Sequence, residues 1–322
     1  MNKKELQNYV EKIWDDQIIP ELIDYIRIPN KSPAFDPDWQ KNGYMEQVVD
    51  QFVRWANDQK IPDMELDVVR LEGRTPLIFM DIPATDPSQS ENTILLYGHL
   101  DKQPEMTGWK EDLGPWIPVI KDDKLYGRGG ADDGYAMFSS LTAISALQKQ
   151  NIPHARCVVI IESCEESGSY DLPFYIDELS ERIGQPDLVI CLDSGCGNYD
   201  QLWCTSSLRG LAGGELSVEI IKQGAHSGDA SGIVPDSFRI VRQLIDRIEN
   251  AETGEILLKE CQAEIPQSRQ QQAKIAAEVI GEKSYSRFPF VGEENNKAKP
   301  INYDLAELVL NRTWRPALSI IG

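Results

Sequence analysis

The sequence predicts an α/β protein with a mostly parallel sheet, helices on both faces of the sheet, and a smaller α+β domain. Three observations support this fold class. Apolar runs of strand length alternate with longer segments of helical periodicity, which is typical of a sheet covered on both faces. Three of those runs, at residues 93–97, 157–161 and 188–192, end at or shortly before histidine or carboxylate side chains. After residue 206 a Gly-rich connection leads into a different pattern, so we expect one domain over residues 1–205 and a second over residues 206–322.

Helices and strands follow one another in order along the first domain. Apolar spacing over residues 3–27 predicts a helix, with a break near Pro20 because proline cannot donate the helical hydrogen bond. A second helix is predicted over residues 44–59, before two strands over residues 64–71 and 77–82. The elements then alternate, with strands over residues 93–97, 157–161 and 188–192 and helices over residues 135–149 and 172–183.

The second domain is predicted to contain both helices and strands. Alternating apolar residues over 215–221 indicate a half-buried strand, and the spacing over 235–249 indicates an amphipathic helix. Further elements are predicted as helices over residues 256–265, 270–280 and 304–310 and as a strand over residues 316–321.

Composition and charge narrow the class of function. With 322 residues, 41% hydrophobic and 26% charged, the chain can hold two domains with substantial cores. A net charge of −20 argues against nucleic acid as a partner, because nothing offsets the repulsion of phosphates. No apolar run approaches the ~20 residues that span a bilayer, so we expect no membrane segment. The N-terminus lacks the apolar core of a signal peptide, so we expect a cytoplasmic protein. In that reducing compartment we expect the six cysteines to be buried free thiols.

His99 and Asp101 follow the apolar run over residues 93–97. Side chains two residues apart in an extended segment point the same way, and the carboxyl end of a strand is where open α/β sheets bind ligands. His99 can bind a metal ion, and Asp101 can hold its ring in one tautomer. Alone this pair is a weak signal, because a histidine and an aspartate often stand at a strand end without a shared function.

Three more acidic groups follow at regular intervals along the chain. They are Asp132 with Asp133, Glu165 with Glu166, and Asp193. In a parallel sheet they would converge with His99 on one edge. Six carboxylates and one imidazole in one cleft require protons or cations, and this donor set suits zinc, with manganese or cobalt as alternatives. Taken singly, the same groups would be interpreted as a helix cap, solvated loop acids and a turn.

Five ordered motifs carry a resemblance to a known family. They are Gly98-His99-Leu100-Asp101, Gly127-Arg128-Gly129 followed by Asp132-Asp133-Gly134, Glu165-Glu166-Ser167-Gly168-Ser169, Asp193-Ser194, and Gly224-Ala225-His226-Ser227-Gly228. Together they resemble the co-catalytic zinc peptidase family of carnosinase-type dipeptidases, aminoacylases, succinyl-diaminopimelate desuccinylase and glutamate carboxypeptidase. Gly108-Trp109 and the run from Ser207 to Gly210 look most like the dipeptidase branch. The resemblance implies hydrolysis of the peptide bond in dipeptides or short peptides. A hydrolase of N-acyl or N-carbamoyl amino acids, or a non-catalytic protein, is the alternative.

The resemblance also implies a set of metal ligands. His99 and Asp193 would bind one zinc ion and Glu166 a second, so that a full-length subunit holds two. Asp132 would bridge the two ions and would be joined to Asp133 by a cis peptide bond.

Catalytic and substrate-binding roles follow from the same resemblance. Asp101 would orient His99, and Glu165 would be the general base. In the family the smaller domain is an inserted lid that forms a homodimer. His226 would then reach the site from the partner subunit, and Arg315 would grip the carboxylate of the substrate.

The histidine count departs from the family pattern. The second zinc ion needs one more histidine late in the chain, and this sequence has only three, at positions 99, 154 and 226. Gly322 falls in what the pattern indicates to be a strand of the lid. We therefore expect a C-terminally truncated piece, in which residues 206–322 are an incomplete lid and the rest of the catalytic domain is absent. A natural short form without the second zinc site is the alternative.

Overall fold

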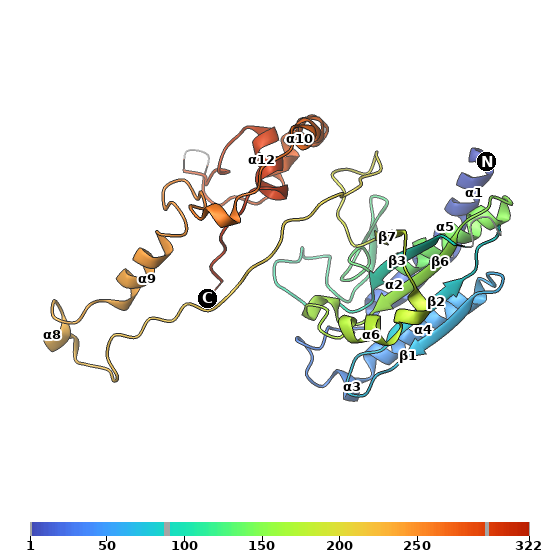
Figure 1. The fold of residues 1–322 in the computed structure, drawn as a ribbon, viewed down its shortest axis with the longest axis horizontal. Coiled ribbons are helices and arrows are strands. Elements are labelled where there is room, and N and C mark those ends of the chain that lie inside the picture. The colour runs from blue at the N-terminus through green and yellow to red at the C-terminus, as the bar shows by residue number, and fades with distance from the viewer. Residues whose placement is uncertain (1, 87–90, 294–295, 322) are drawn as a thin grey trace. The chain divides into compact units, whose positions relative to one another are not determined.

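The computed structural model describes residues 2–86, 91–293 and 296–321 and divides the chain into two compact units, Met1–Ser194 and Gly195–Gly322 (Figure 1). The first unit contains the whole main sheet, and the second contains helices joined by extended segments. The boundary predicted after residue 205 falls inside the second unit.

The sheet of the first unit is mixed. Its strands, in the order β1-β2-β6-β3-β7, are β1 (Glu65–Val69), β2 (Leu77–Ile82), β6 (Arg156–Glu162), β3 (Thr93–His99) and β7 (Leu188–Cys191). β3 is parallel to β6 and β7, whereas β2 is antiparallel to both β1 and β6. The prediction of a mostly parallel sheet is therefore wrong for β1 and β2. Residues 70–76 are too short a connection for the crossover that a parallel pair requires, so these two strands form a hairpin.

The predicted first helix is interrupted by one wider turn. It consists of α1 (Lys3–Ile13), a π-helical turn η1 (Trp14–Ile18) and α2 (Ile19–Arg27). Pro20 lies in the first turn of α2, where a missing N–H is tolerated. The break near Pro20 therefore takes the form of a π turn that precedes the proline.

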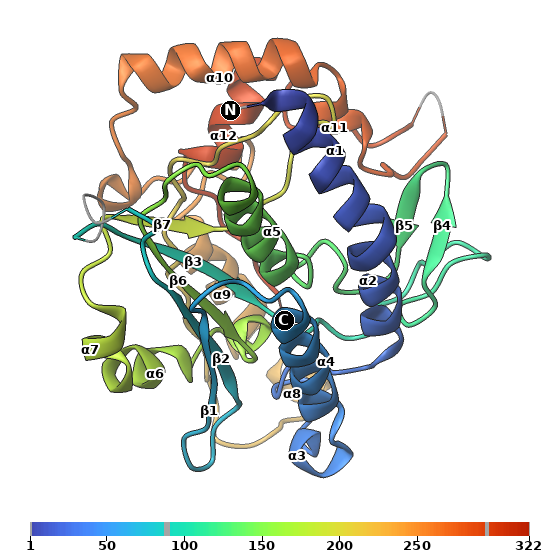
Figure 2. The same cartoon turned by 90° about the vertical axis from the view of Figure 1, so that its right-hand side faces the viewer.

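Helices cover both faces of the sheet, as predicted (Figure 2). One face carries α1, α2, α4 (Tyr44–Asp58) and α5 (Ala136–Lys149), and the other carries α6 (Leu172–Glu178) and α7 (Ser180–Ile183). Neighbouring residues of β2 alternate between the two layers: Ile78 packs with the first group and Phe79 with the second. The central strands β2, β3 and β6 are therefore almost continuously apolar, and burial on both faces fixes their register.

Aromatic rings form the centre of the larger layer. Phe138 of α5 meets Phe52 and Trp55 of α4, with ring centroids 4.9 Å and 4.7 Å apart. Phe52 also contacts Tyr25 of α2 at 5.3 Å. Three helices distant in sequence are thus packed together above the sheet, and Tyr25 extends this packing toward the ends of the strands.

The connection between β3 and α5 contains a small hairpin that the sequence reasoning did not identify. β4 (Val119–Lys121) and β5 (Lys124–Tyr126) pair antiparallel across Asp122 and Asp123, which both have positive φ. Two residues with positive φ are what a tight hairpin turn requires. The chain then passes through the Gly-rich residues 127–130 to the paired aspartates before α5.

The second unit is helical where it has regular structure. Its elements are α8 (Ser227–Ala230), α9 (Ser237–Ile245), the 3-10 turn η4 (Lys259–Cys261), α10 (Gln267–Ile280), α11 (Lys283–Ser286) and α12 (Leu305–Thr313). Among the residues described in this unit there is no strand, so the strands predicted over 215–221 and 316–321 are corrected to extended segments. Leu216 and Ile221 remain half exposed, because no neighbouring strand offers them a partner. The predicted helix over 256–265 is reduced to η4.

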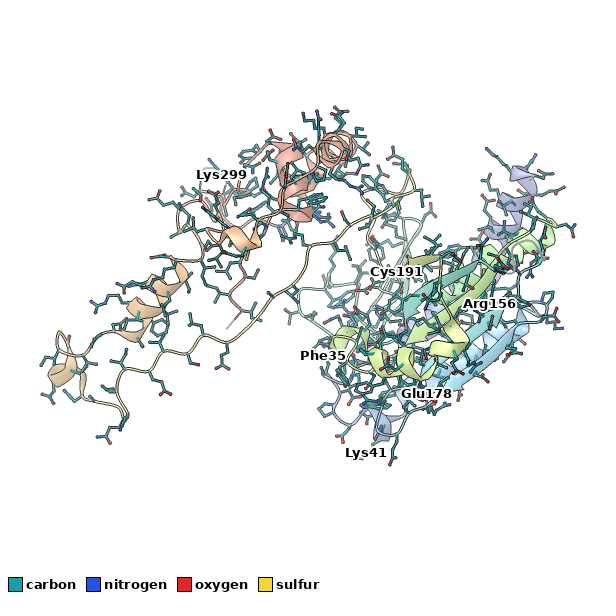
Figure 3. All side chains as sticks on the ribbon, in the orientation of Figure 1. Phe35, Lys41, Arg156, Glu178, Cys191 and Lys299 are labelled. Carbon is teal, nitrogen blue, oxygen red and sulfur yellow. The ribbon has the colours of Figure 1, made fainter. Side chains whose placement is uncertain are left out.

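Two predictions from composition can be compared with the structure. Cys157 and Cys164 are buried free thiols, but the other four cysteines are exposed, including Cys191 at the end of β7 (labelled in Figure 3). Across residues 2–86, 91–293 and 296–321, no helix has both the length and the apolar character needed to cross a bilayer.

Gly98 is the position in β3 where a side chain cannot be accommodated. A Cβ there would overlap the Cβ of Ala136 and lie 2.7 Å from Oδ2 of Asp133. Gly98→Ala should therefore lower the free energy of unfolding by about 1–3 kcal/mol through overpacking. Urea denaturation checks this against Gly213→Ala, where a Cβ would meet no atom within 4 Å. Equal midpoints for the two variants would contradict the close packing of β3 against α5.

Candidate metal centre

The carboxyl ends of β3, β6 and β7 meet at one edge of the sheet. His99, the last residue of β3, pairs in register with Glu162, the last residue of β6. β7 is parallel to β3 and ends at Cys191, two residues before Asp193. The 3-10 turn η3 (Glu165–Ser167) follows β6. Because parallel strands end at the same edge, residues distant in sequence come together there.

His99 lies at the centre of this group and is completely buried. Its Nε2 lies 3.3 Å from Oδ1 of Asp132 and 3.8 Å from a carboxylate oxygen of both Glu165 and Asp193. Its Nδ1 lies 3.1 Å from the main-chain oxygen of Asp101 and 3.4 Å from Oδ1 of the same residue. One ring nitrogen therefore faces the carboxylates, and the other is held by Asp101, which is the arrangement of an oriented metal ligand.

The carboxylate of Asp101 also fixes the glutamate pair. Its Oδ1 accepts the main-chain N–H of Glu165 at 3.1 Å, and its Oδ2 accepts that of Glu166 at 3.0 Å. Asp101 is completely buried, so these bonds are needed to offset the loss of water around a charged group. The sequence suggested only that Asp101 orients His99. In the structure it also sets the turn after β6.

Asp132 and Asp133 face different groups although they are adjacent. The peptide bond between them is cis, as the family resemblance implied. Asp132 is directed at Nε2 of His99, while Oδ2 of Asp133 accepts the main-chain N–H of His99 at 3.2 Å. Burial raises the pKa of Asp133 to about 8. Of the pair, only Asp132 contributes an oxygen to the group around the imidazole.

The structure brings together all five residues proposed as metal ligands or base. Two sets of ligand atoms lie within 4.8 Å of one another, one from His99, Asp132 and Glu166 and the other from His99, Glu165 and Asp193. An imidazole surrounded by carboxylate oxygens is a donor set for zinc, manganese or cobalt. The two sets share His99, so the structure groups the ligands differently from the division that the resemblance implied.

Charge in the centre is poorly balanced without a cation. Burial raises the pKa of Glu166 to about 7, although Gln103 donates a hydrogen bond to it. Burial also raises the pKa of Glu165 and of Asp193. The carboxylate of Asp193 adds to the effect on Glu165, and those of Asp132 and Asp101 add to the effect on Asp193. Oε1 of Glu166 is buried without a hydrogen-bond partner among the described residues. An orphaned carboxylate oxygen and several raised pKa values are what a divalent cation would relieve.

His99 supplies a positive charge within the metal-free cluster. Burial by itself lowers the pKa of the imidazole, but hydrogen bonds to Asp101 and Asp132 outweigh it and raise the pKa to about 11. A metal ion would have to displace that proton, since a ligating imidazole is neutral at the nitrogen that binds.

Sequence reasoning missed two polar residues beside the centre. Glu162 is buried, accepts the hydroxyl of Tyr97 at 2.5 Å and that of Ser169 at 3.0 Å, and has its pKa raised to about 7 by burial. Gln103 donates to Glu166 from the loop after β3. The signal for Glu162 was an acid directly at the end of an apolar run. Gln103 gave none, because a glutamine in a polar loop is usually solvated.

His226 and Arg315 lie in the second unit, and their predicted roles stay predictions. His226 is exposed, and its Nδ1 accepts the N–H of Gly228 at 3.1 Å at the start of α8. Arg315 pairs with Glu307 at 2.7 Å and donates to Asn311 at 2.7 Å.

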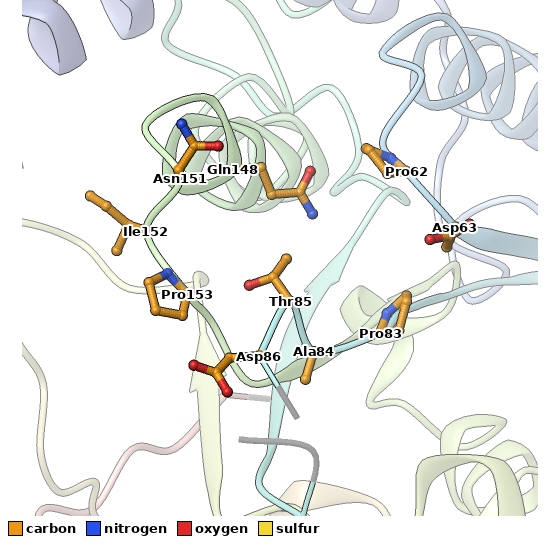
Figure 4. A pocket seen from close by; sticks show the side chains of 10 residues that line it. All are labelled: Pro62, Asp63, Pro83, Ala84, Thr85, Asp86, Gln148, Asn151, Ile152 and Pro153. Carbon is orange, nitrogen blue, oxygen red and sulfur yellow. The ribbon is translucent and has the colours of Figure 1, made fainter. Parts of the chain in front are cut away.

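A hollow in the first unit lies away from the candidate metal centre (Figure 4). It is lined by Pro62, Asp63, Pro83, Ala84, Thr85, Asp86, Gln148, Asn151, Ile152 and Pro153. Its walls follow the end of β2 and precede the start of β6, where Ile82 pairs with Cys157. This is the opposite edge of the sheet from His99, so the hollow is not part of the candidate metal centre.

The chain shares sequence with known proteins. Peptidase family M20/M25/M40 matches residues 95–286. The chain is 27% identical over 256 residues to the Beta-Ala-His dipeptidase of Homo sapiens, which covers 77% of this chain and 47% of that protein. It is also 27% identical over 264 residues to the Cys-Gly metallodipeptidase DUG1 of Saccharomyces cerevisiae. That alignment covers 77% of this chain and 50% of the yeast protein. The chain therefore spans about half the length of these curated relatives.

The fold also has a counterpart among solved structures. The crystal structure of human carnosine dipeptidase 1 superposes with a TM-score of 0.61 at 19% sequence identity, over 99% of this chain and 66% of that one. At this identity the likeness concerns the fold alone.

The raised carboxyl pKa values predict how the metal-free chain responds to pH. Glu162 and Glu166 titrate near 7 and Asp133 near 8 in the folded chain, well above their values in an unfolded chain. The folded chain thus holds protons that the unfolded chain has released, so this stabilisation is present at acid pH and is lost as pH rises through 7 and 8. The urea midpoint in a chelator should fall between about pH 6 and about pH 8.5.

Saturating zinc should reverse this slope, because ligand carboxylates must lose their protons to bind a metal. A midpoint that rises with pH in the chelator would contradict the raised pKa values.

Proposed function

The chain belongs to peptidase family M20/M25/M40. We propose that it forms part of a metal-dependent hydrolase that cleaves the peptide bond of dipeptides or short peptides. The observation that carries this proposal is the buried imidazole of His99 with its Nε2 directed at carboxylates from three different segments. The names of two relatives, a Beta-Ala-His dipeptidase and a Cys-Gly metallodipeptidase, support a dipeptide as the substrate class.

Zinc is the proposed ion, with two per subunit in the active protein and manganese or cobalt as substitutes. His99, Asp132, Glu166 and Asp193 would hold it. When bound, a divalent cation would polarise the scissile carbonyl and make water acidic enough to react near neutral pH. The residues of the chain determine where that chemistry occurs. Asp101 orients the ring of His99 through Nδ1, and Gln103 donates a hydrogen bond to the side chain of Glu166.

Glu165 is the proposed general base. Its side chain is about one third exposed, so a substrate can reach it, while Asp101 fixes its main chain. Burial raises the pKa of Glu165, and the carboxylate of Asp193 adds to that effect. A carboxylate with a raised pKa is a better proton acceptor near neutral pH than an ordinary one. Glu165 would take the proton of the attacking water and deliver it to the leaving amine.

The second unit is proposed to supply substrate-binding groups and a dimer contact. His226 is exposed with Nδ1 occupied by the turn, which leaves Nε2 to donate to a substrate carbonyl in a partner subunit. Arg315 would bind the substrate carboxylate, and for this it would have to exchange its pairing with Glu307.

A panel of substrates tests the reaction class. With added zinc or manganese, the protein should release amino acids from dipeptides faster than from N-acetyl amino acids. Faster cleavage of the N-acetyl compounds would assign the protein to N-acyl amino acid hydrolysis, and turnover of neither class would refute the proposed activity.

Glu165→Gln tests the base. It removes the proton acceptor but keeps the shape of the side chain, so kcat should fall about 10²- to 10⁴-fold. Zinc affinity should change little, because none of the four proposed ligands, His99, Asp132, Glu166 and Asp193, is altered. Glu178→Gln, at an exposed position of α6 labelled in Figure 3, is the matched control and should behave as wild type. A variant that loses zinc while retaining turnover per bound metal would refute the assignment.

A further inference from the structure

Lys102 follows Asp101 directly in the chain and is completely buried. Its ammonium donates to main-chain carbonyls rather than to a carboxylate. An amine buried without a paired anion persists only where oriented groups compensate its lost hydration. The groups that do so here connect the metal centre to α2.

The C-terminal end of α2 receives the side chain of Lys102. Nζ donates to the main-chain oxygen of Tyr25 at 2.6 Å and to that of Ile28 at 2.7 Å. Carbonyls at this end of a helix carry the negative end of its dipole. Nζ also lies 3.6 Å from the ring centroid of Tyr25, within the range of a cation–π contact. Two N–H donors suffice for the two carbonyls, so the connection holds whether the amine is charged or neutral.

The end of α2 and the segment after it bind back to the same loop. The hydroxyl of Tyr25 donates to the main-chain oxygen of Leu100 at 2.8 Å, and Nδ2 of Asn30 donates to that oxygen at 2.6 Å. The N–H of Ser32 donates to the main-chain oxygen of Lys102 at 2.9 Å. The residues on both sides of Asp101 are therefore tied to residues 25–32.

The stem of Lys102 also supports the segment that carries Asp132. Gly129 has a φ of +85°, and a Cβ there would lie 2.6 Å from Cε of Lys102. The backbone at Gly129 thus rests directly on the lysine stem, three residues before Asp132. Lys102 belongs to the loop that presents His99, and its stem supports the segment that presents Asp132.

We propose that Lys102 is a positioning residue of the metal centre, which holds the His99–Asp101 loop and the segment before Asp132 in register by anchoring both to the end of α2. The inference rests on the metal centre proposed above. It assigns to Lys102 an effect on metal affinity that a residue serving only the stability of the unit would not have.

Zinc affinity measured by competition with a chromogenic chelator tests this proposal. Lys102→Met keeps the length of the stem and removes the donors, so the zinc dissociation constant should rise about tenfold or more. Tyr175→Phe is the matched control. It removes a buried hydroxyl that donates to the main-chain oxygen of Thr75 at 2.6 Å on the other face of the sheet. The control should lower the urea midpoint without changing zinc affinity.

The outcomes separate the two proposals. A folded Lys102→Met chain whose zinc affinity stays within about twofold of wild type overturns the positioning role. If Lys102→Met does not fold, Lys102→Gln carries the test, because its shorter side chain keeps an amide donor and loses only part of the hydrogen bonding to the end of α2. That variant should weaken zinc binding about fivefold, and an unchanged affinity would overturn the inference. A wild-type chain that binds no zinc refutes the metal centre itself.

Discussion

The buried carboxylate of Asp101 is the interaction on which the candidate metal centre depends. One oxygen accepts the main-chain N–H of Glu165, the other accepts that of Glu166, and the same group lies 3.4 Å from Nδ1 of His99. Strand β3 and the turn after β6 are thereby locked together at the edge of the sheet. These bonds hold the glutamates beside the imidazole although neighbouring carboxylates repel them and raise their pKa values.

That arrangement favours function over the stability of the metal-free chain. Several carboxylates are partly buried beside one imidazole, and burial raises the pKa of Glu165, Glu166 and Asp193. The same groups would be stabilised by a divalent cation, so binding free energy becomes folding free energy in the loaded protein. Lys102 and Gln103 extend the support outward, one to α2 and the other to Glu166.

The residues of the centre could be predicted because they follow apolar strands that end at one edge. His99, Asp132, Glu166 and Asp193 each stand where a strand has just ended or a helix is about to begin, and the structure brings them together. The direction of β2 could have been inferred from the short connection after β1, but periodicity alone does not carry strand direction. Strands in the second unit were wrongly predicted over 215–221 and 316–321. An apolar pattern shows that a segment could form a strand with one buried face, but it does not show whether a neighbouring strand is there to pair with it. Lys102 could not be identified, because a lysine in a loop is usually solvated and only tertiary contacts with α2 explain its burial.

The central claim is that His99 and the carboxylates around it bind a metal ion. Metal-free protein loaded with zinc and studied by X-ray absorption tests this most directly, since it reports the atoms that surround the ion. We predict a shell of nitrogen and oxygen at about 2.0–2.2 Å that includes one imidazole and is lost in His99→Ala. A shell containing sulfur at about 2.3 Å would place the zinc on exposed cysteines such as Cys191 and would contradict the account.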